Sequence, residues 1–177
     1  MTLYAFLLFI HLTGAVALFL AFGVEWTAIS FLGNSATPQE AQQWLRLGRL
    51  GPLINGPALG VLILSGGYLA HLSGTMRQGW IPASIVGILV VGALGGAINV
   101  PRMRAIRQAI PEGGEKLSSA LHNNLLPISV RLRTFGALGI VFMMVTKQSF
   151  VQSLLVLLGG LVLGLLLSVP VFSRKPA

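Results

Sequence analysis

Five long apolar stretches constrain this 177-residue chain more than any other feature of its sequence. A helix needs about 20 apolar residues to cross the hydrocarbon core of a bilayer. A segment in lipid must also satisfy its own backbone hydrogen bonds, which a helix does internally. Hydrophobic residues make up 54% of the chain and charged residues only 9%. We therefore predict an all-α fold, a polytopic helical bundle embedded in a membrane.

The predicted spans and one short interfacial helix account for most of the chain, so no room remains for a soluble domain. The spans cover about residues 3–33, 52–72, 80–100, 127–146 and 150–172. Thr37, Pro38 and Glu40 are typical of a helix start, with Thr37 as the N-cap. They begin an interfacial helix at about residues 38–50. Residues 1–177 are thus predicted to form a single integral membrane domain.

The distribution of basic residues predicts the orientation. With the N-terminus outside, only Arg77 and Lys147 of the 12 Lys and Arg residues lie on the outer side. The other ten lie on the cytoplasmic side, as the positive-inside rule requires. We expect a bacterial plasma membrane protein whose C-terminus is cytoplasmic. Because the basic residues occupy short loops, the net charge of +8 indicates contact with anionic lipid rather than nucleic acid.

Two histidines and two methionines are candidates for holding a redox cofactor. Cysteine is absent, which excludes thiolate metal sites, iron–sulfur clusters and covalently attached haem. His11 lies about 12 Å into the first span at 1.5 Å per residue, and His71 lies near the outer end of the second. Met143 and Met144 lie near the outer end of the fourth span. Two imidazoles, or one imidazole and a methionine, could ligate haem b, and copper is the less favoured choice.

The alternative interpretation is that these residues bind no cofactor. In that case His11 is a buried, hydrogen-bonded residue and His71 an interfacial one. Met143 and Met144 are then ordinary apolar packing. The sequence leaves both interpretations open.

The inner half of the bundle contains one acidic residue, Glu25, and two arginines of the fourth span, Arg131 and Arg133. Residues two apart on a helix point to roughly opposite sides. One arginine is therefore expected to face the bundle and the other to extend to the headgroups. An ion pair from Glu25 to Arg131 or Arg133 is one interpretation, and a basic pocket for an anionic ligand or lipid headgroup is the other.

Glycines four residues apart occur in three of the predicted spans, a spacing that lets helices approach closely. The pairs are Gly56/Gly60, Gly92/Gly96 and Gly160/Gly164. We expect them to serve packing within the bundle, and a homo-oligomer or another membrane protein as partner is the alternative.

The segment from Phe9 to Ala15, which contains His11, resembles the start of several compact bacterial membrane families. These are a family of uncharacterised predicted integral membrane proteins, the CopD-type copper-resistance membrane domain and the HemJ-type protoporphyrinogen oxidases. The similarity to the uncharacterised family extends through Glu25 and Trp26, the Arg-rich end of the third span and residues 131–133. The resemblance implies that His11 is an axial haem ligand or a metal ligand. Residues 16–19, which read Val-Ala-Leu-Phe, depart from the Trp and paired glycines that often follow such a histidine.

Two functions are consistent with these features. The first is a small integral membrane protein that binds a His-ligated redox cofactor in its outer half, with haem b preferred to copper. The second is a cofactor-free accessory subunit that packs against a larger membrane complex and holds anionic lipid through its inner-side arginines. The sequence contains no Ser/His/Asp set, His-Glu-x-x-His helix or phosphate-cradling glycine loop that would assign a catalytic residue.

Overall fold

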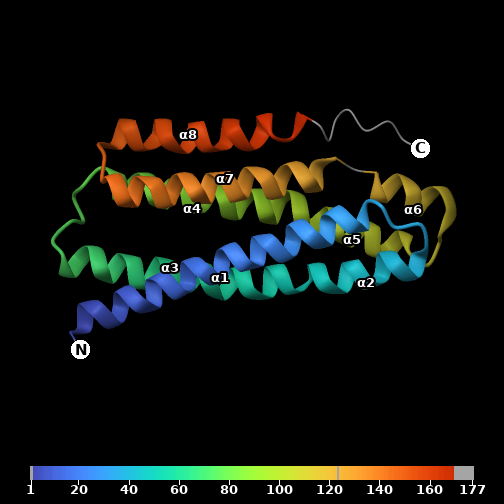
Figure 1. The fold of residues 1–177 in the computed structure, drawn as a ribbon, viewed down its shortest axis with the longest axis horizontal. Coiled ribbons are helices and arrows are strands. Elements are labelled where there is room, and N and C mark those ends of the chain that lie inside the picture. Colours follow the sequence, from blue (N-terminus) through green and yellow to red (C-terminus); the bar gives the residue numbers. More distant parts are fainter. Residues whose placement is uncertain (1, 123, 170–177) are drawn as a thin grey trace.

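A computed structural model describes residues 2–122 and 124–169, and every regular element in these residues is a helix. The long helices run along one common axis (Figure 1). In chain order the elements are α1 (Leu3–Leu32), α2 (Pro38–Gly48), α3 (Leu50–Leu72), α4 (Trp80–Leu94), the π-helical segment η1 (Gly95–Asn99), α5 (Val100–Ala109), α6 (Gly114–Leu121), α7 (Leu125–Thr146) and α8 (Phe150–Leu166). This architecture confirms the predicted all-α membrane bundle.

Four helical stretches are long and apolar enough to cross a membrane: Leu3–Leu32, Pro38–Leu72, Trp80–Ala109 and Gly114–Thr146. The fifth predicted span corresponds to α8, which has 17 residues. At 1.5 Å per residue α8 is about 26 Å long, at the lower limit for a spanning helix. It ends at Leu166 rather than near residue 172, and residues 170–172 lie outside the described part of the chain.

The start of α2 follows the predicted capping pattern with one change. The Thr37 hydroxyl accepts the backbone N–H of Glu40 at 3.3 Å, and Pro38 occupies the first turn. The Glu40 carboxylate accepts from the N–H of Ala36, one residue before the N-cap. α2 packs on the end of α1 and continues in line with α3 along the bundle (Figure 1).

The boundaries of the second, third and fourth spans differ from the predicted ones. α3 begins at Leu50 and α7 at Leu125, two residues before the expected starts. The third span continues as one helical stretch from Trp80 to Ala109, where an end near residue 100 was expected. Its continuation past Pro101 depends on the π-helical segment η1, described below.

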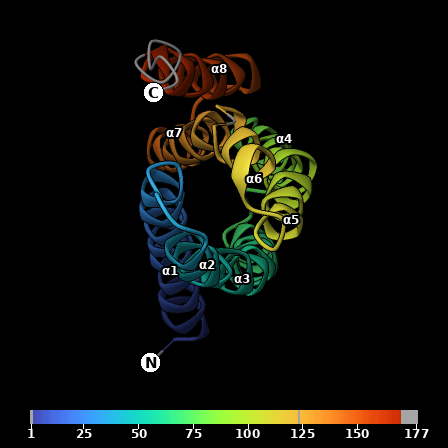
Figure 2. The same cartoon turned by 90° about the vertical axis from the view of Figure 1, so that its right-hand side faces the viewer.

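The outer surface of the bundle is apolar. Leu64 on α3 and Val145 on α7 are each 76% exposed. Viewed end-on, α1, α3, α4 and α7 surround a common centre and α8 lies outside, against α7 (Figure 2). A surface of exposed leucine, valine and phenylalanine side chains suits contact with lipid chains.

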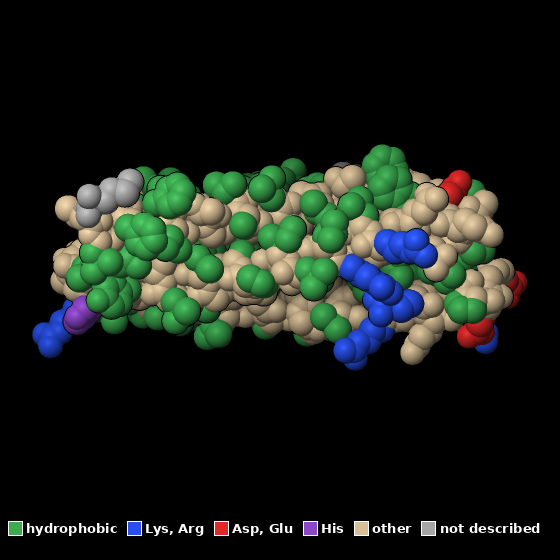
Figure 3. All heavy atoms as spheres, turned by 90° about the horizontal axis from the view of Figure 1, so that it is seen from below, with side chains coloured by type: hydrophobic (Ala, Val, Ile, Leu, Met, Phe, Trp, Pro, Cys, Tyr) green, Lys and Arg blue, Asp and Glu red, His purple; other side chains and the backbone are tan. Residues whose placement is uncertain are grey.

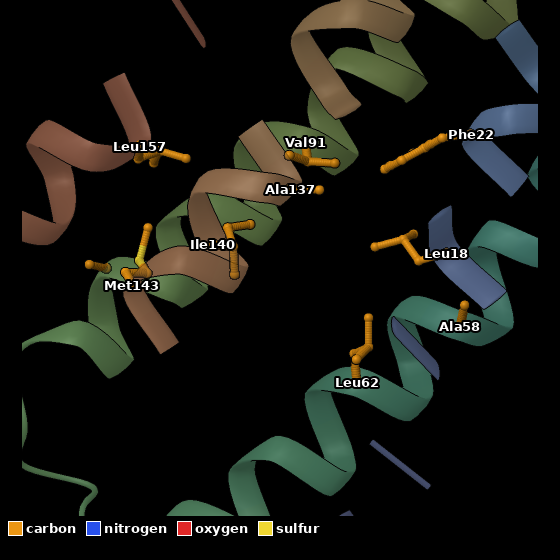
Figure 4. Close-up of a cluster of buried hydrophobic side chains, with 10 residues drawn as sticks. Leu18, Phe22, Ala58, Leu62, Val91, Ala137, Ile140, Met143 and Leu157 are labelled. Atoms are coloured by element: carbon orange, nitrogen blue, oxygen red, sulfur yellow. The ribbon is translucent and has the colours of Figure 1, made fainter. Parts of the chain in front are cut away.

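Two apolar clusters form the interior. The first joins residues of α1, α3, α4, α7 and α8 (Figure 4), and its members are Leu18, Phe22, Ala58, Leu62, Ala83, Val91, Ala137, Ile140, Met143 and Leu157. The second lies toward the end of the bundle formed by α2, α5 and α6, and its members are Ile29, Leu32, Ala41, Leu45, Ile106, Leu126 and Val130.

One of the three glycine pairs lies in a close helix–helix contact. A Cβ added at Gly160 would lie 2.6 Å from the carbonyl oxygen of Phe135, and one at Gly164 would lie 3.0 Å from that of Arg131. These glycines let the backbones of α7 and α8 approach, which confirms internal packing for this pair. The other four positions have no atom within 4 Å of an added Cβ: Gly56, Gly60, Gly92 and Gly96.

Candidate functional site

Four polar side chains from four elements meet inside the bundle, and we call them the polar centre. They are Glu25 of α1, Asn55 of α3, Asn99 of η1 and Arg133 of α7. All four are buried, and Glu25 is only 3% exposed. Ionisable residues inside a membrane bundle are costly and are a functional-site hypothesis by default.

The polar centre forms a layer between the two apolar clusters. On α1, Glu25 lies three residues after Phe22 of the first cluster and four before Ile29 of the second. On α7, Arg133 lies three residues after Val130 of the second cluster and four residues before Ala137 of the first. Since three- and four-residue steps keep side chains on one helix face, each helix presents apolar, charged and apolar side chains to the interior in turn.

Glu25 accepts hydrogen bonds from the other three members of the polar centre. Its Oε2 lies 2.6 Å from Arg133 Nη1 and 3.3 Å from Asn99 Nδ2, and its Oε1 lies 2.9 Å from Asn55 Nδ2. The Arg133 guanidinium also lies 4.9 Å from the centroid of the Phe22 ring. Of the two ion pairs that the sequence left open, the structure has the one between Glu25 and Arg133.

Hydrogen bonding in the polar centre is incomplete. Asn55 Oδ1, Asn99 Oδ1 and Arg133 Nε are buried and have no hydrogen-bond partner. Each unsatisfied buried group costs about 1–3 kcal/mol, which is more than the net contribution of about 0.5–1.5 kcal/mol from a typical hydrogen bond. The Glu25 carboxylate thus accepts three hydrogen bonds, whereas each of its three partners keeps one buried polar atom without a partner in the protein.

The π-helical segment η1 explains how Asn99 reaches Glu25. Pro101 has no N–H and its ring collides with the carbonyl four residues earlier in an α-helix, which here is that of Ala97. The wider π turn from Gly95 to Asn99 lies immediately before this proline. Ser129 on α7 donates a hydrogen bond of 3.4 Å to the carbonyl of Leu94 at the start of the segment. Such π turns inside α-helices occur frequently at functional sites.

Two glycines make room for the ion pair. A Cβ at Gly51 would overlap the Cγ and carboxylate atoms of Glu25. A Cβ at Gly95 would lie 3.0 Å from Cζ of Arg133. Both helices thus present bare backbone to the charged groups, and neither position has a positive φ angle.

The second arginine of α7 faces away from the polar centre. Arg131 is half-buried, and its guanidinium lies 5.3 Å from the centroid of the Trp26 ring. A small cleft at this place is lined by Trp26, Ile29, Ser30, Pro127, Val130 and Arg131. The structure therefore separates the two arginines, with Arg133 in the interior and Arg131 beside an exposed tryptophan.

His11 is packed against α3 in the opposite half of the bundle. Its Nδ1 lies 3.0 Å from Oγ of Ser65, and the ring lies over Gly66, where a Cβ would be 2.9 Å from Cε1. Ser65 donates its own hydroxyl to the carbonyl of Val61, so its oxygen accepts from His11 Nδ1–H. In this tautomer the lone pair of the imidazole is on Nε2. An apolar cavity of about 350 Å³ lies between the same two helices, although His11 is not among the residues that line it.

The structure does not gather the other candidate ligands around His11. His71 is exposed in the last turn of α3, and its ring lies 6.4 Å from that of Tyr68. Met143 is fully buried in the first apolar cluster, and Met144 packs against that cluster. Within residues 2–122 and 124–169, no three His, Cys, Asp or Glu side chains form a group that could hold a metal ion.

Sequence reasoning assigned no role to Asn55 and Asn99, and it missed the π-helical segment. A signal for the latter was present, because Gly95 and Gly96 precede Pro101 inside one apolar stretch. That combination favours a local widening of the helix. No comparable signal predicts which helix face the two asparagines occupy.

Comparison with known proteins gives one match. The model of a protein family described as predicted integral membrane protein (DUF2269) matches residues 5–148. No curated protein and no solved structure matches the chain.

Proposed function

The chain belongs to this family of predicted integral membrane proteins, and on that premise we propose that it binds anionic phospholipid at one end of its bundle. The end concerned carries α2, α5 and α6. The positive-inside rule orients this end to the cytoplasm and the start of α1 to the outside, in keeping with a bacterial plasma membrane. The observation that carries the proposal is the concentration of arginines just beyond the apolar surface.

We call five of these arginines the arginine belt. They are Arg46, Arg49, Arg102, Arg104 and Arg107. None of the five is buried, and Figure 3 shows most of the Lys and Arg side chains of this face gathered toward one end, where Asp and Glu side chains also lie, with a basic side chain beside a histidine at the opposite end. A basic residue near an anionic membrane surface contributes about 1 kcal/mol of attraction. The belt as a whole therefore favours anionic over zwitterionic lipid by several kcal/mol.

The cleft beside Arg131 supports a defined headgroup position in addition to this diffuse attraction. The guanidinium of Arg131 lies over the Trp26 indole, and aromatic side chains of this kind are enriched where membrane helices meet the lipid headgroups. Arg133 lies elsewhere, in the ion pair with Glu25. A phosphate near the cleft would therefore interact with Arg131 and with the hydroxyl of Ser30.

Lipid retention tests the proposal directly. The purified protein is placed in nanodiscs of mixed phosphatidylglycerol and phosphatidylcholine, and the lipids that it retains are counted by native mass spectrometry. Arg131→Gln and the triple change Arg102→Gln, Arg104→Gln, Arg107→Gln should each reduce retained phosphatidylglycerol. Arg77→Gln, at the opposite end, is the matched control and should leave it unchanged. Equal retention of the two lipids by the unchanged protein would refute the proposal.

An accessory role in a larger membrane complex fits the same architecture. The connections between helices are short and the outer surface of the bundle is apolar, so most of what a partner could contact lies within the bilayer. We propose such a partner on this basis. Solubilisation in a mild detergent should then recover a second membrane protein at fixed stoichiometry, and a stable monomer alone would count against the role.

Binding of a His-ligated cofactor is another candidate function, and the contact between His11 and Ser65 favours it. Metal-ligating histidines commonly donate their other ring N–H to a neighbouring group, which fixes the tautomer. His11 would supply one ligand of this kind, and a bound haem or copper ion would add redox chemistry there. An absorbance spectrum before and after dithionite, with iron and copper analysis, tests it. A Soret band that His11→Ala abolishes would support the ligand, and a featureless, metal-free protein would exclude it.

A further inference from the structure

The polar centre contains three buried polar atoms without a hydrogen-bond partner, two of them acceptors and one a donor. The acceptors are the side-chain oxygens of Asn55 and Asn99, and the donor is Nε of Arg133. Taken as whole residues, Asn55, Asn99 and Arg133 are 5%, 7% and 5% exposed, respectively. Buried polar atoms in proteins almost always have a partner, either in the protein or in ordered water. Three orphans around one carboxylate therefore indicate a missing partner.

The charge of the polar centre identifies what kind of partner fits. Glu25 and Arg133 form an ion pair, so the centre carries no net charge. A cation would approach the guanidinium, and an anion would approach the carboxylate, each at a cost in this buried setting. A neutral partner avoids both penalties. It has to donate hydrogen bonds to the two amide oxygens and accept one from Arg133.

The hydrogen-bonding capacity of water meets this requirement with two O–H donors and two lone pairs. Buried water typically makes about three hydrogen bonds to otherwise unsatisfied groups. We propose that the polar centre binds water, and that Glu25, Asn55, Asn99 and Arg133 form a hydrated site inside the membrane bundle.

The surroundings of the site support this proposal. η1 replaces regular α-helical geometry with a wider turn that ends at Asn99, one of the two residues with an unpaired amide oxygen. In membrane proteins, ordered water commonly satisfies polar groups where a helix departs from regular geometry. The two apolar clusters lie on either side of the layer and confine the water to it.

The absence of cysteine from the sequence allows a clean accessibility test in the full chain. Asn55→Cys is compared with Ala58→Cys, its neighbour one turn along α3, which is equally buried at 5% exposure but belongs to the first apolar cluster. Because only a hydrated thiol ionises to the reactive thiolate, Asn55→Cys in nanodiscs should react with 2-aminoethyl methanethiosulfonate at least about tenfold faster. Equal rates for the two variants would overturn the proposal.

Hydroxyl-radical footprinting in H₂¹⁸O provides a second measurement that needs no substitution at the site. Radicals form from the water itself, so they oxidise side chains beside bound water even where these are buried. Phe22, which is 2% exposed and lies under the Arg133 guanidinium, should incorporate ¹⁸O. Met143 belongs to the same apolar cluster as Phe22, is 0% exposed and is intrinsically more oxidisable. It lies ten residues along α7 from Arg133, about 15 Å at 1.5 Å per residue, and should not incorporate ¹⁸O. An unlabelled Phe22 would overturn the proposal whatever the cysteine variants do.

Discussion

Replacing Glu25 by leucine removes the carboxylate that pairs with the buried guanidinium of Arg133. The two side chains are 4% and 7% exposed and lie 2.6 Å apart, so neither is screened by solvent. Removing one partner of such a pair costs about 3–5 kcal/mol, because the remaining charge is left buried and uncompensated. The two asparagine hydrogen bonds to Glu25 are lost as well, at about 0.6 kcal/mol each for a polar contact within a membrane protein.

The charge therefore dominates, and we expect Glu25→Leu to lower the free energy of unfolding by about 4–6 kcal/mol. The double variant Glu25→Leu/Arg133→Leu removes both charges at once. Apolar replacement of a whole buried pair is often neutral or stabilising, so the double variant should recover most of the loss. The asparagine amides that remain unpaired limit this recovery.

Reversible unfolding in mixed micelles of mild detergent and sodium dodecyl sulfate, followed by circular dichroism, measures these differences. Glu25→Gln is the isosteric control, because it keeps the shape and one acceptor but removes the charge. If Glu25→Leu lowered the free energy of unfolding by less than about 1 kcal/mol, the pair would contribute no more than a surface ion pair, and a strong buried interaction would be refuted. A double variant less stable than the single one would refute it as well.

Three further predictions concern backbone packing and are tested in the same unfolding assay. Gly160→Ala places a Cβ against the α7 backbone and should lower the free energy of unfolding by about 1–3 kcal/mol through overpacking. Gly159→Ala meets no atom within 4 Å and should leave the stability unchanged. Equal effects of the two variants would contradict the contact between α7 and α8. Gly51→Ala should displace the acidic side chain of the polar centre and destabilise the protein, while Gly56→Ala on the same helix meets no atom within 4 Å and should be tolerated. Lys147 follows α7 in the left-handed conformation, with a φ of 51°. Lys147→Gly should therefore be neutral or stabilising, and Lys147→Val should cost about 1 kcal/mol. A glycine variant less stable than the valine variant would refute the left-handed conformation at this position.

Span positions were predictable because they depend on local properties of the chain. The first predicted span, residues 3–33, corresponds to α1 at Leu3–Leu32. Apolar length and composition alone identify such a segment, because a bilayer admits only a backbone that bonds within itself. The break between the spans predicted at 127–146 and 150–172 likewise corresponds to the connection between α7, which ends at Thr146, and α8, which begins at Phe150.

The half of the bundle in which a residue lies was also predictable, since it follows from counting residues along a span. Glu25, Arg131 and Arg133 were placed in the same half, and the structure brings Glu25 to Arg133 and the neighbouring Trp26 to Arg131. The outer candidates His11 and His71 were placed in the opposite half. Their separation in the structure could not be counted from the sequence, because it depends on how α1 and α3 face each other.

The class of fold, the approximate spans, the half of the bundle that holds each candidate residue and the charge difference between the two ends could all be derived from the amino-acid sequence. These properties follow from local hydropathy and from the fixed rise of a helix. Only the tertiary structure decided that Arg133 rather than Arg131 pairs with Glu25, and that Asn55 and Asn99 complete the site. Helix rotation is set by side-chain packing against neighbouring helices, and the π turn before Pro101 turns Asn99 toward the same centre.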